Sequence, residues 1–229
     1  MSHFSVAVIH RKDQSIEKLL APYDENIEVA PYVIMTRQEA IDHARKYHNL
    51  GKNPTDEDCW KSTAEGYHNK TDKDGNICCT YNPRSRWDWW TIGGRFDGSL
   101  IVNGKPENTG KIRDIDFSPN SKVYEHAKEI WEAVIEGKAK KEPISSPFTK
   151  EELLGTFSDK DSFARNRSLF TTYAVVTPDG NWYELGQMGW WGLSSETVAE
   201  ERDWNDFYKE RFIDTADPEM YMTIVDCHI

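Results

Sequence analysis

Short apolar runs bounded by turn residues recur along the chain, and they predict strands. Residues 4–9 form a compact, β-branched apolar run that is typical of a buried strand. Residues 170–176 and 181–185 form two further runs joined by Thr-Pro-Asp-Gly, which predicts a hairpin. Residues 220–227 form the last run of this kind. We expect these strands to share one mainly antiparallel sheet.

Apolar residues at helical spacing predict helices between these strands. Residues 36–48 open with the capping box Thr-Arg-Gln-Glu. A helix over residues 119–137 is expected to be capped by Ser118, because proline at the next position suits the first turn. A third amphipathic helix is expected over residues 196–212. The fold class that follows is α+β, a mainly antiparallel sheet with helices packed on it, in a single domain over residues 1–229.

Three further elements are predicted in the middle of the chain. Residues 56–67 suit a helix, and residues 77–81 and 96–102 suit strands. The pair Asn103-Gly104 follows the second of these strands and is typical of a tight turn, because both types accept a left-handed backbone.

The charge of the chain narrows the choice of partners. The sequence has 28 Lys and Arg against 39 Asp and Glu, a formal net charge of −11. A protein that wraps nucleic acid must neutralise phosphates, so we do not expect nucleic acid as a partner. The acidic surplus suits ordinary solubility, and it leaves open an acidic inhibitor that mimics nucleic acid. The apolar runs are too short to span a bilayer and no secretory signal stands before them, so we expect a cytoplasmic protein without a membrane partner.

The four cysteines do not form a recognisable metal or disulfide pattern. No two of them show Cys-x-x-Cys spacing, so we expect reduced thiols, no bound metal and no cofactor. A zinc site from Cys59, His68 and Cys78 is the alternative, although its spacing matches no standard pattern.

Residues 81–96 concentrate aromatic, glycine and charged residues, and they are the main candidate for a binding site. Tryptophan rings offer flat faces for a base or sugar, paired glycines let a backbone approach a ligand closely, and arginine presents a planar fork to carboxylate or phosphate. The expected ligand-binding residues of this block are Tyr81, Asn82, Trp87, Asp88, Trp90, Gly93, Gly94 and Arg95.

A second glycine-flanked aromatic block, Gly189-Trp-Trp-Gly192, adds Trp190 and Trp191 to the expected ligand-binding residues. The alternative for both blocks is that their tryptophans fill the core while the glycines allow close packing. The charges of Asp88 and Arg95 argue against full burial unless the two residues pair with each other.

The end of the chain offers candidate catalytic residues. Asp226 and His228 stand two apart on the last expected strand, so their side chains point to the same face. This pair suits a general base with the carboxylate that orients it, or two metal ligands. The alternative is a terminal strand whose polar side faces solvent. No nucleophile elbow, phosphate-binding loop or dinucleotide fingerprint is present in the sequence.

Several segments together carry a resemblance to a known family. They are residues 2–4, 20–25, 81–95, 177–182, 188–192 and 223–229, of which the tryptophan-rich block is the most specific. On these residues the chain resembles a family of uncharacterised proteins from bacteriophages and prophages. The resemblance implies a phage setting, the cytoplasm of the bacterial host, and variable insertions near residues 50–76 and 104–165. It implies no reaction.

Three hypotheses about function follow from the residues and the resemblance. The first is a phage accessory protein that acts on host physiology or immunity, as an anti-defence protein, by binding a small aromatic, anionic, nucleotide-like ligand in a cleft lined by tryptophan, glycine and arginine. The second is an enzyme that acts on such a ligand with Asp226 and His228 as an acid–base pair. The third is an acidic protein that inhibits a host defence protein by surface contact.

Overall fold

The computed structural model describes the whole chain except residues 1, 69, 138–147 and 187–193. The chain divides into two compact units: a larger one of Met1–Pro22 and Arg86–Ile229, and a smaller one of Tyr23–Ser85. Each unit is described by itself below. This division does not test the expectation of a single domain over residues 1–229, which stays a prediction.

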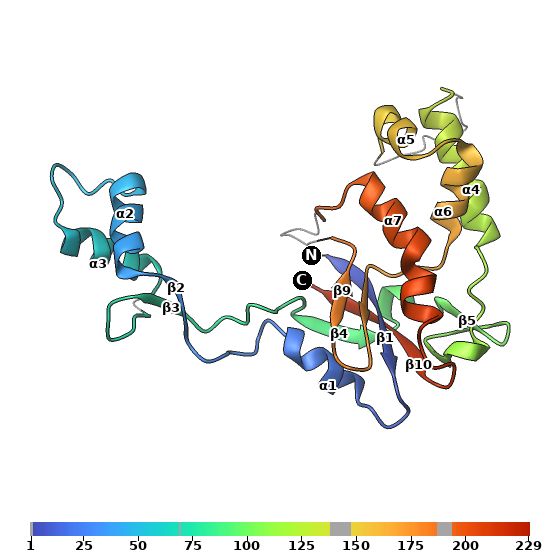
Figure 1. Cartoon of the computed structure of the whole chain (residues 1–229), viewed down its shortest axis with the longest axis horizontal. Coiled ribbons are helices and arrows are strands. Elements are labelled where there is room, and N and C mark those ends of the chain that lie inside the picture. The colour runs from blue at the N-terminus through green and yellow to red at the C-terminus, as the bar shows by residue number, and fades with distance from the viewer. Residues whose placement is uncertain (1, 69, 138–147, 187–193) are drawn as a thin grey trace. The chain divides into compact units, whose positions relative to one another are not determined.

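The larger unit contains the central sheet that the sequence predicts, and the α+β fold class is confirmed. β1 pairs antiparallel with β10 along its whole length and parallel with β8, whereas β8 and β9 form the expected hairpin. β4 and β7 both pair antiparallel with β10, each with a different stretch of it. By their hydrogen bonding the strands lie in the order β4 (Trp89–Ile92), β10 (Tyr221–His228), β1 (His3–His10), β8 (Ala174–Val176) and β9 (Trp182–Glu184), with β7 (Thr109–Lys111) off this path. Figure 1 shows β1 and β10 side by side.

One face of this sheet packs against the helix α7 (Val198–Tyr208) and the π-helical turn η5 (Lys209–Ile213) that continues it. Tyr208 and Phe212 from this helix join alternate apolar residues of β1 and β10 in one buried cluster. The apolar stripe expected over residues 196–212 is therefore the face that covers the sheet.

Three helices of the larger unit pack around a second cluster in which Phe163 is completely buried. They are α4 (Ser121–Val134), α5 (Lys150–Thr156) and α6 (Lys160–Ser168). The start expected for α4 is wrong: Asn120 is the cap instead of Ser118, because its side-chain oxygen accepts from the backbone N–H groups of Lys122 and Val123.

The remaining elements of the larger unit are short. β5 (Leu100–Val102) and β6 (Lys105–Glu107) form a hairpin, and the turn between them is the predicted Asn103-Gly104 pair, with positive φ at both residues. The other short elements are α1 (Ile16–Leu20), η1 (Ala21–Tyr23), which runs into the smaller unit, η2 (Gly94–Phe96) and η3 (Ile112–Asp114).

The smaller unit has two helices and a two-stranded sheet. β2 (Tyr32–Met35) pairs antiparallel with β3 (Ile77–Cys79), and the helices are α2 (Arg37–Tyr47) and α3 (Asp56–Gly66). Ile41, Ala44 and Cys59 form the buried contact between the helices, and both helices begin with a capping box.

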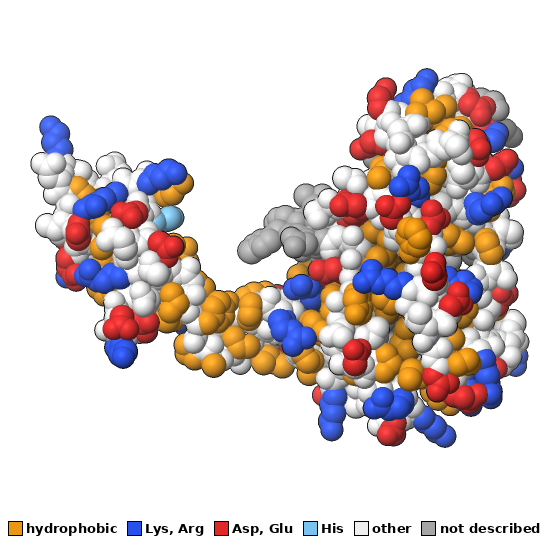
Figure 2. Space-filling model, viewed as in Figure 1, with side chains coloured by type: hydrophobic (Ala, Val, Ile, Leu, Met, Phe, Trp, Pro, Cys, Tyr) orange, Lys and Arg blue, Asp and Glu red, His pale blue; other side chains and the backbone are white. Residues whose placement is uncertain are grey.

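The surface of both units mixes the two signs of charge, since acidic and basic side chains are interspersed on the face that Figure 2 shows. None of the helices in the described part of the chain is long and apolar enough to cross a bilayer.

Candidate functional site

The chain's two long strands bring three chemically active side chains to one place. β1 and β10 run antiparallel with His3 opposite His228 and Ser5 opposite Asp226. Opposed residues of an antiparallel pair point to the same face, and residues two apart on a strand do so as well. His3, Asp226 and His228 therefore share one face at one end of the sheet.

Asp226 pairs with His3 and not with its neighbour on the strand. The His3 Nδ1 lies 2.9 Å from the Asp226 Oδ1, and the backbone N–H of Arg95 donates to Oδ2 at 2.8 Å. Asp226 retains only 2% of its exposure. An ionised carboxylate only accepts hydrogen bonds, so when the His3 ring is neutral this contact places its proton on Nδ1 and its lone pair on Nε2.

His228 pairs with a second carboxylate, that of Asp88. Its Nδ1 lies 2.6 Å from the Asp88 Oδ1, and the backbone N–H of Asp88 donates to the His228 carbonyl at 2.9 Å. The His228 Nε2 is buried and has no hydrogen-bond partner within the described residues. The same tautomer argument places the His228 proton on Nδ1.

The two carboxylate–histidine pairs touch each other through their rings. The ring centroids of His3 and His228 are 5.2 Å apart and nearly perpendicular, at 74°. The Trp89 ring stacks on His228 at 5.3 Å and 15°, and meets His3 edge-on at 5.3 Å. Trp89 is 43% exposed, so one side of this aromatic group faces solvent. We call His3, Asp88, Trp89, Asp226 and His228 the dyad cluster.

The glycine pair next to the cluster serves an internal carboxylate. Gly94 has a φ of +55°, and a Cβ built on it would lie 2.6 Å from the Asp226 Cβ. Gly93 also has positive φ, and a Cβ there would overlap the Asn108 side chain. Gly94 thus permits the close approach that the sequence suggested, but the group approached is Asp226, which the Arg95 N–H can then reach.

The remaining predicted residues of the tryptophan-rich block do not belong to the dyad cluster. β4 places Trp89 opposite His228 and Trp90 opposite Cys227, so Trp90 lies on the other face from the dyad cluster. Trp87 is buried, as the core alternative proposed. Arg95 does not pair with Asp88: its side chain is exposed and makes no ion pair with any residue that the structure describes.

Four other predicted ligand-binding residues belong to the smaller unit or lie outside the described residues. Tyr81 and Asn82 belong to the smaller unit, where the buried Asn82 amide donates to the Asp24 carbonyl at 3.0 Å and the Tyr81 hydroxyl accepts from Ser85. Trp190 and Trp191 lie outside the described residues.

Sequence reasoning did not select His3 and Trp89, and it considered Asp226 and His228 as a pair, whereas in the structure each of the two side chains contacts another residue. In the structure each side chain takes its partner from elsewhere: Asp226 contacts His3 on β1, and His228 contacts Asp88, the residue just before β4. A signal for His3 was available: antiparallel pairing of the first and last strands would set a histidine near the start opposite one near the end.

None of the four cysteine thiols belongs to the dyad cluster. All four cysteines are free, and burial raises the pKa of the Cys227 thiol, which points to the opposite face from Asp226. No group of three metal-ligand side chains occurs among the described residues.

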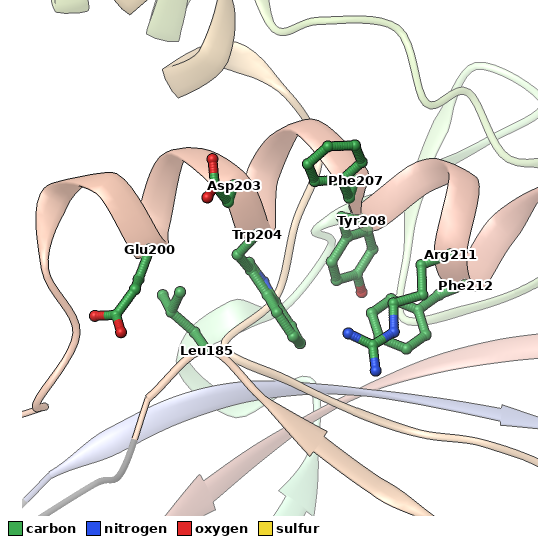
Figure 3. Close-up of a pocket in the computed structure, with 8 residues that line it drawn as sticks. All are labelled: Leu185, Glu200, Asp203, Trp204, Phe207, Tyr208, Arg211 and Phe212. Atoms are coloured by element: carbon green, nitrogen blue, oxygen red, sulfur yellow. The ribbon is translucent and has the colours of Figure 1, made fainter. Parts of the chain in front are cut away.

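A hollow of about 280 Å³ lies elsewhere, between α7 and the end of β9 (Figure 3). It is lined by Leu185, Glu200, Asp203, Trp204, Phe207, Tyr208, Arg211 and Phe212. None of the predicted binding or catalytic residues that the structure describes is in this lining.

No protein-family model, curated protein or solved structure matches the chain. The resemblance to phage proteins therefore stays a prediction. The geometry of the described side chains carries the functional argument.

Proposed function

We propose that the larger unit binds a small aromatic anion, such as a nucleotide, beside the dyad cluster and acts on it by general acid–base catalysis. The observation that carries the proposal is the contact between two carboxylate–histidine pairs, His3 with Asp226 and His228 with Asp88. A histidine held by a carboxylate through Nδ1 is the usual arrangement for proton transfer at Nε2.

His3 is the residue that we assign to proton transfer. Its side chain is 13% exposed, and among the described residues its hydrogen bond is made by Nδ1 and not by Nε2. Asp226 holds the ring in one orientation and stabilises the imidazolium that forms when Nε2 takes a proton. His228 supports the ring of His3 from the side and is itself fixed by Asp88.

Trp89 and Arg95 supply binding groups for such a ligand. The exposed side of the Trp89 ring can stack a base, which is worth about 1–3 kcal/mol in nucleic-acid complexes. The Arg95 guanidinium is exposed, and its own backbone N–H is bonded to the carboxylate that orients His3. The Arg95 backbone is thus adjacent to the dyad cluster, and its guanidinium is the group that we propose takes the phosphate.

Within the phage setting that the resemblance implies, this activity would make the chain an accessory protein that removes or alters a nucleotide-like signal of the bacterial host. Capture of the same ligand without conversion is the second candidate, since Trp89 and Arg95 are binding groups whether or not His3 transfers a proton. Inhibition of a host protein by the acidic surface is the third.

Incubation with a nucleotide panel, with bound and converted ligand read by mass spectrometry, tests the proposal. Removal of a general base costs about 10²–10⁴-fold in rate, so His3→Asn, which keeps a donor for Asp226, should lose conversion by that factor and retain binding. His126→Asn, at an exposed histidine on α4, is the matched control and should change neither.

The outcomes separate the three candidates. Conversion that is lost in His3→Asn supports the enzyme. Retention of a nucleotide without conversion supports capture, and Arg95→Ala should then abolish retention with little change in melting temperature because this side chain is exposed. Neither retention nor conversion would refute both ligand hypotheses and leave the inhibitor.

A further inference from the structure

The hollow beside α7 has walls that suit an aromatic ring. The indole N–H of Trp204 donates to the Thr172 carbonyl at 2.9 Å, which fixes that ring. Phe207, also in the lining, is 58% exposed and adds a second aromatic ring to its wall. Figure 3 shows Trp204 directed from α7 toward the sheet, with Leu185 beside it.

The two carboxylates in the lining already have partners. The Nε and Nη2 of Arg202 contact Asp203 Oδ1 at 2.9 and 2.6 Å, and Figure 3 shows this carboxylate directed away from the sheet. Glu200 accepts from the backbone N–H and the hydroxyl of Thr197 at 2.7 and 2.9 Å, as the second half of the α7 capping box. Neither carboxylate therefore needs a cation from a ligand.

Arg211 is the charge in this lining that has no carboxylate partner among the described residues. Its guanidinium lies 4.8 Å from the centroid of the Tyr183 ring and 5.2 Å from that of Phe212, so cation–π contacts hold it in place. Such contacts do not neutralise the charge, and the planar fork remains available to a carboxylate or phosphate. Figure 3 shows the guanidinium on the same side of α7 as the Trp204 ring.

The positions of Glu200 on α7 and Arg211 on η5 separate the two signs of charge. Glu200 and Arg211 are eleven residues apart, which corresponds to about 16 Å along a helix, with Trp204 between them. An anion at Arg211 is thus at the end of the hollow far from Glu200. The volume of about 280 Å³ lies just below the roughly 300–1,000 Å³ of typical ligand pockets, so it suits one ring and not a dinucleotide.

We propose that this hollow is a second ligand site, distinct from the dyad cluster, for a small anion that carries a single aromatic ring. The ring packs against Trp204, and the carboxylate or phosphate pairs with the Arg211 guanidinium. The inference does not depend on the proposed function, because the two sites share no residue.

Phenyl phosphate is the probe, with benzyl alcohol as its uncharged counterpart, and binding is followed by ligand-observed NMR. The wild-type chain should bind phenyl phosphate, and Arg211→Gln should weaken that binding by about tenfold or more, as loss of a charged hydrogen bond does. Arg165→Gln, at an exposed arginine on α6, is the matched control and should bind as the wild type does. Benzyl alcohol should bind at least about tenfold more weakly than phenyl phosphate.

Two further measurements locate the probe. All titrations are repeated in an Arg95→Ala background, which removes the exposed arginine beside the dyad cluster. In the wild type, intermolecular NOEs should join the phenyl protons to the Trp204 indole, and this result decides the question if Arg211→Gln does not fold. Wild-type chain that fails to bind phenyl phosphate, equal binding by Arg211→Gln, or NOEs to Trp89 instead of Trp204 would each overturn the second site.

Discussion

Substitution of Gly94 by alanine would test whether the dyad cluster depends on close backbone approach to Asp226. The new Cβ would lie 2.6 Å from the Asp226 Cβ and 2.9 Å from its Cγ, and it would also overlap Oδ2. Real Cβ contacts are not found at these distances, so something must move. Asp226 is short and 2% exposed, which leaves its side chain little room to swing aside.

The expected cost has two parts. A non-glycine residue at the Gly94 φ of +55° costs about 1–2 kcal/mol. Displacement of Asp226 also loses the hydrogen bond from the Arg95 N–H, and a hydrogen bond to a charged group is worth about 1.5–3 kcal/mol. The sum is about 2.5–5 kcal/mol, a large part of the roughly 5–15 kcal/mol that stabilises a folded domain.

The free energy of unfolding is measured by urea denaturation followed by tryptophan fluorescence. All tryptophans except Trp60 belong to the larger unit, so the signal reports mainly on that unit. Gly104→Ala is the matched control, because Gly104 has a φ of +79° but open space where its Cβ would be. It should cost only the backbone term of about 1–2 kcal/mol.

The comparison of the two variants isolates the contact with Asp226. The Gly94 variant should lose about 1.5–3 kcal/mol more than the Gly104 variant, and conversion or capture of ligand should fall with it because Asp226 no longer holds His3. Equal losses, within about 0.5 kcal/mol, would refute the close approach as the reason for glycine at this position.

Three further predictions concern other parts of the chain. Half-burial raises the pKa of Tyr173 to about 12 in the folded state, against an ordinary 10.0, so the unfolded chain loses this proton first as pH rises. The contribution of Tyr173 to the free energy of unfolding should be complete below pH 10.0 and should fall as pH rises toward about 12. Urea denaturation of the wild type and of Tyr173→Phe across this range measures it. The same pH dependence in both proteins would contradict the prediction. Phe163→Ala should destabilise the helical cluster by about 3–5 kcal/mol, since the ring is fully buried, whereas Leu154→Ala, at a residue 51% exposed on α5, should cost far less by thermal unfolding. A thiol reagent should label the partly exposed Cys78 and Cys79 rapidly and the buried Cys59 and Cys227 only on unfolding, and mass spectrometry of the labelled peptides would expose any other order.

Local signals in the sequence determined most of the regular elements. The capping box at Thr36 starts α2, the Asn103-Gly104 pair makes its turn, and the strand runs near both termini join the central sheet. Each of these signals acts over a few residues: a cap satisfies nearby N–H groups, and a left-handed pair reverses the chain. The cap of α4 was misplaced by two residues because Ser118 and Asn120 are both acceptable caps.

Only the tertiary structure decided which side chains meet. β4 was not predicted, because Trp89 and Ile92 are exposed on an edge strand and do not show the alternation of a half-buried one. The parallel pairing of β1 with β8 joins strands more than 160 residues apart, which no local pattern encodes. The sequence therefore identified Asp226 and His228 as chemically interesting, but their partners, His3 and Asp88, were set by strand register. Register arises from the packing of the whole sheet, and a shift of one residue would turn each side chain to the opposite face.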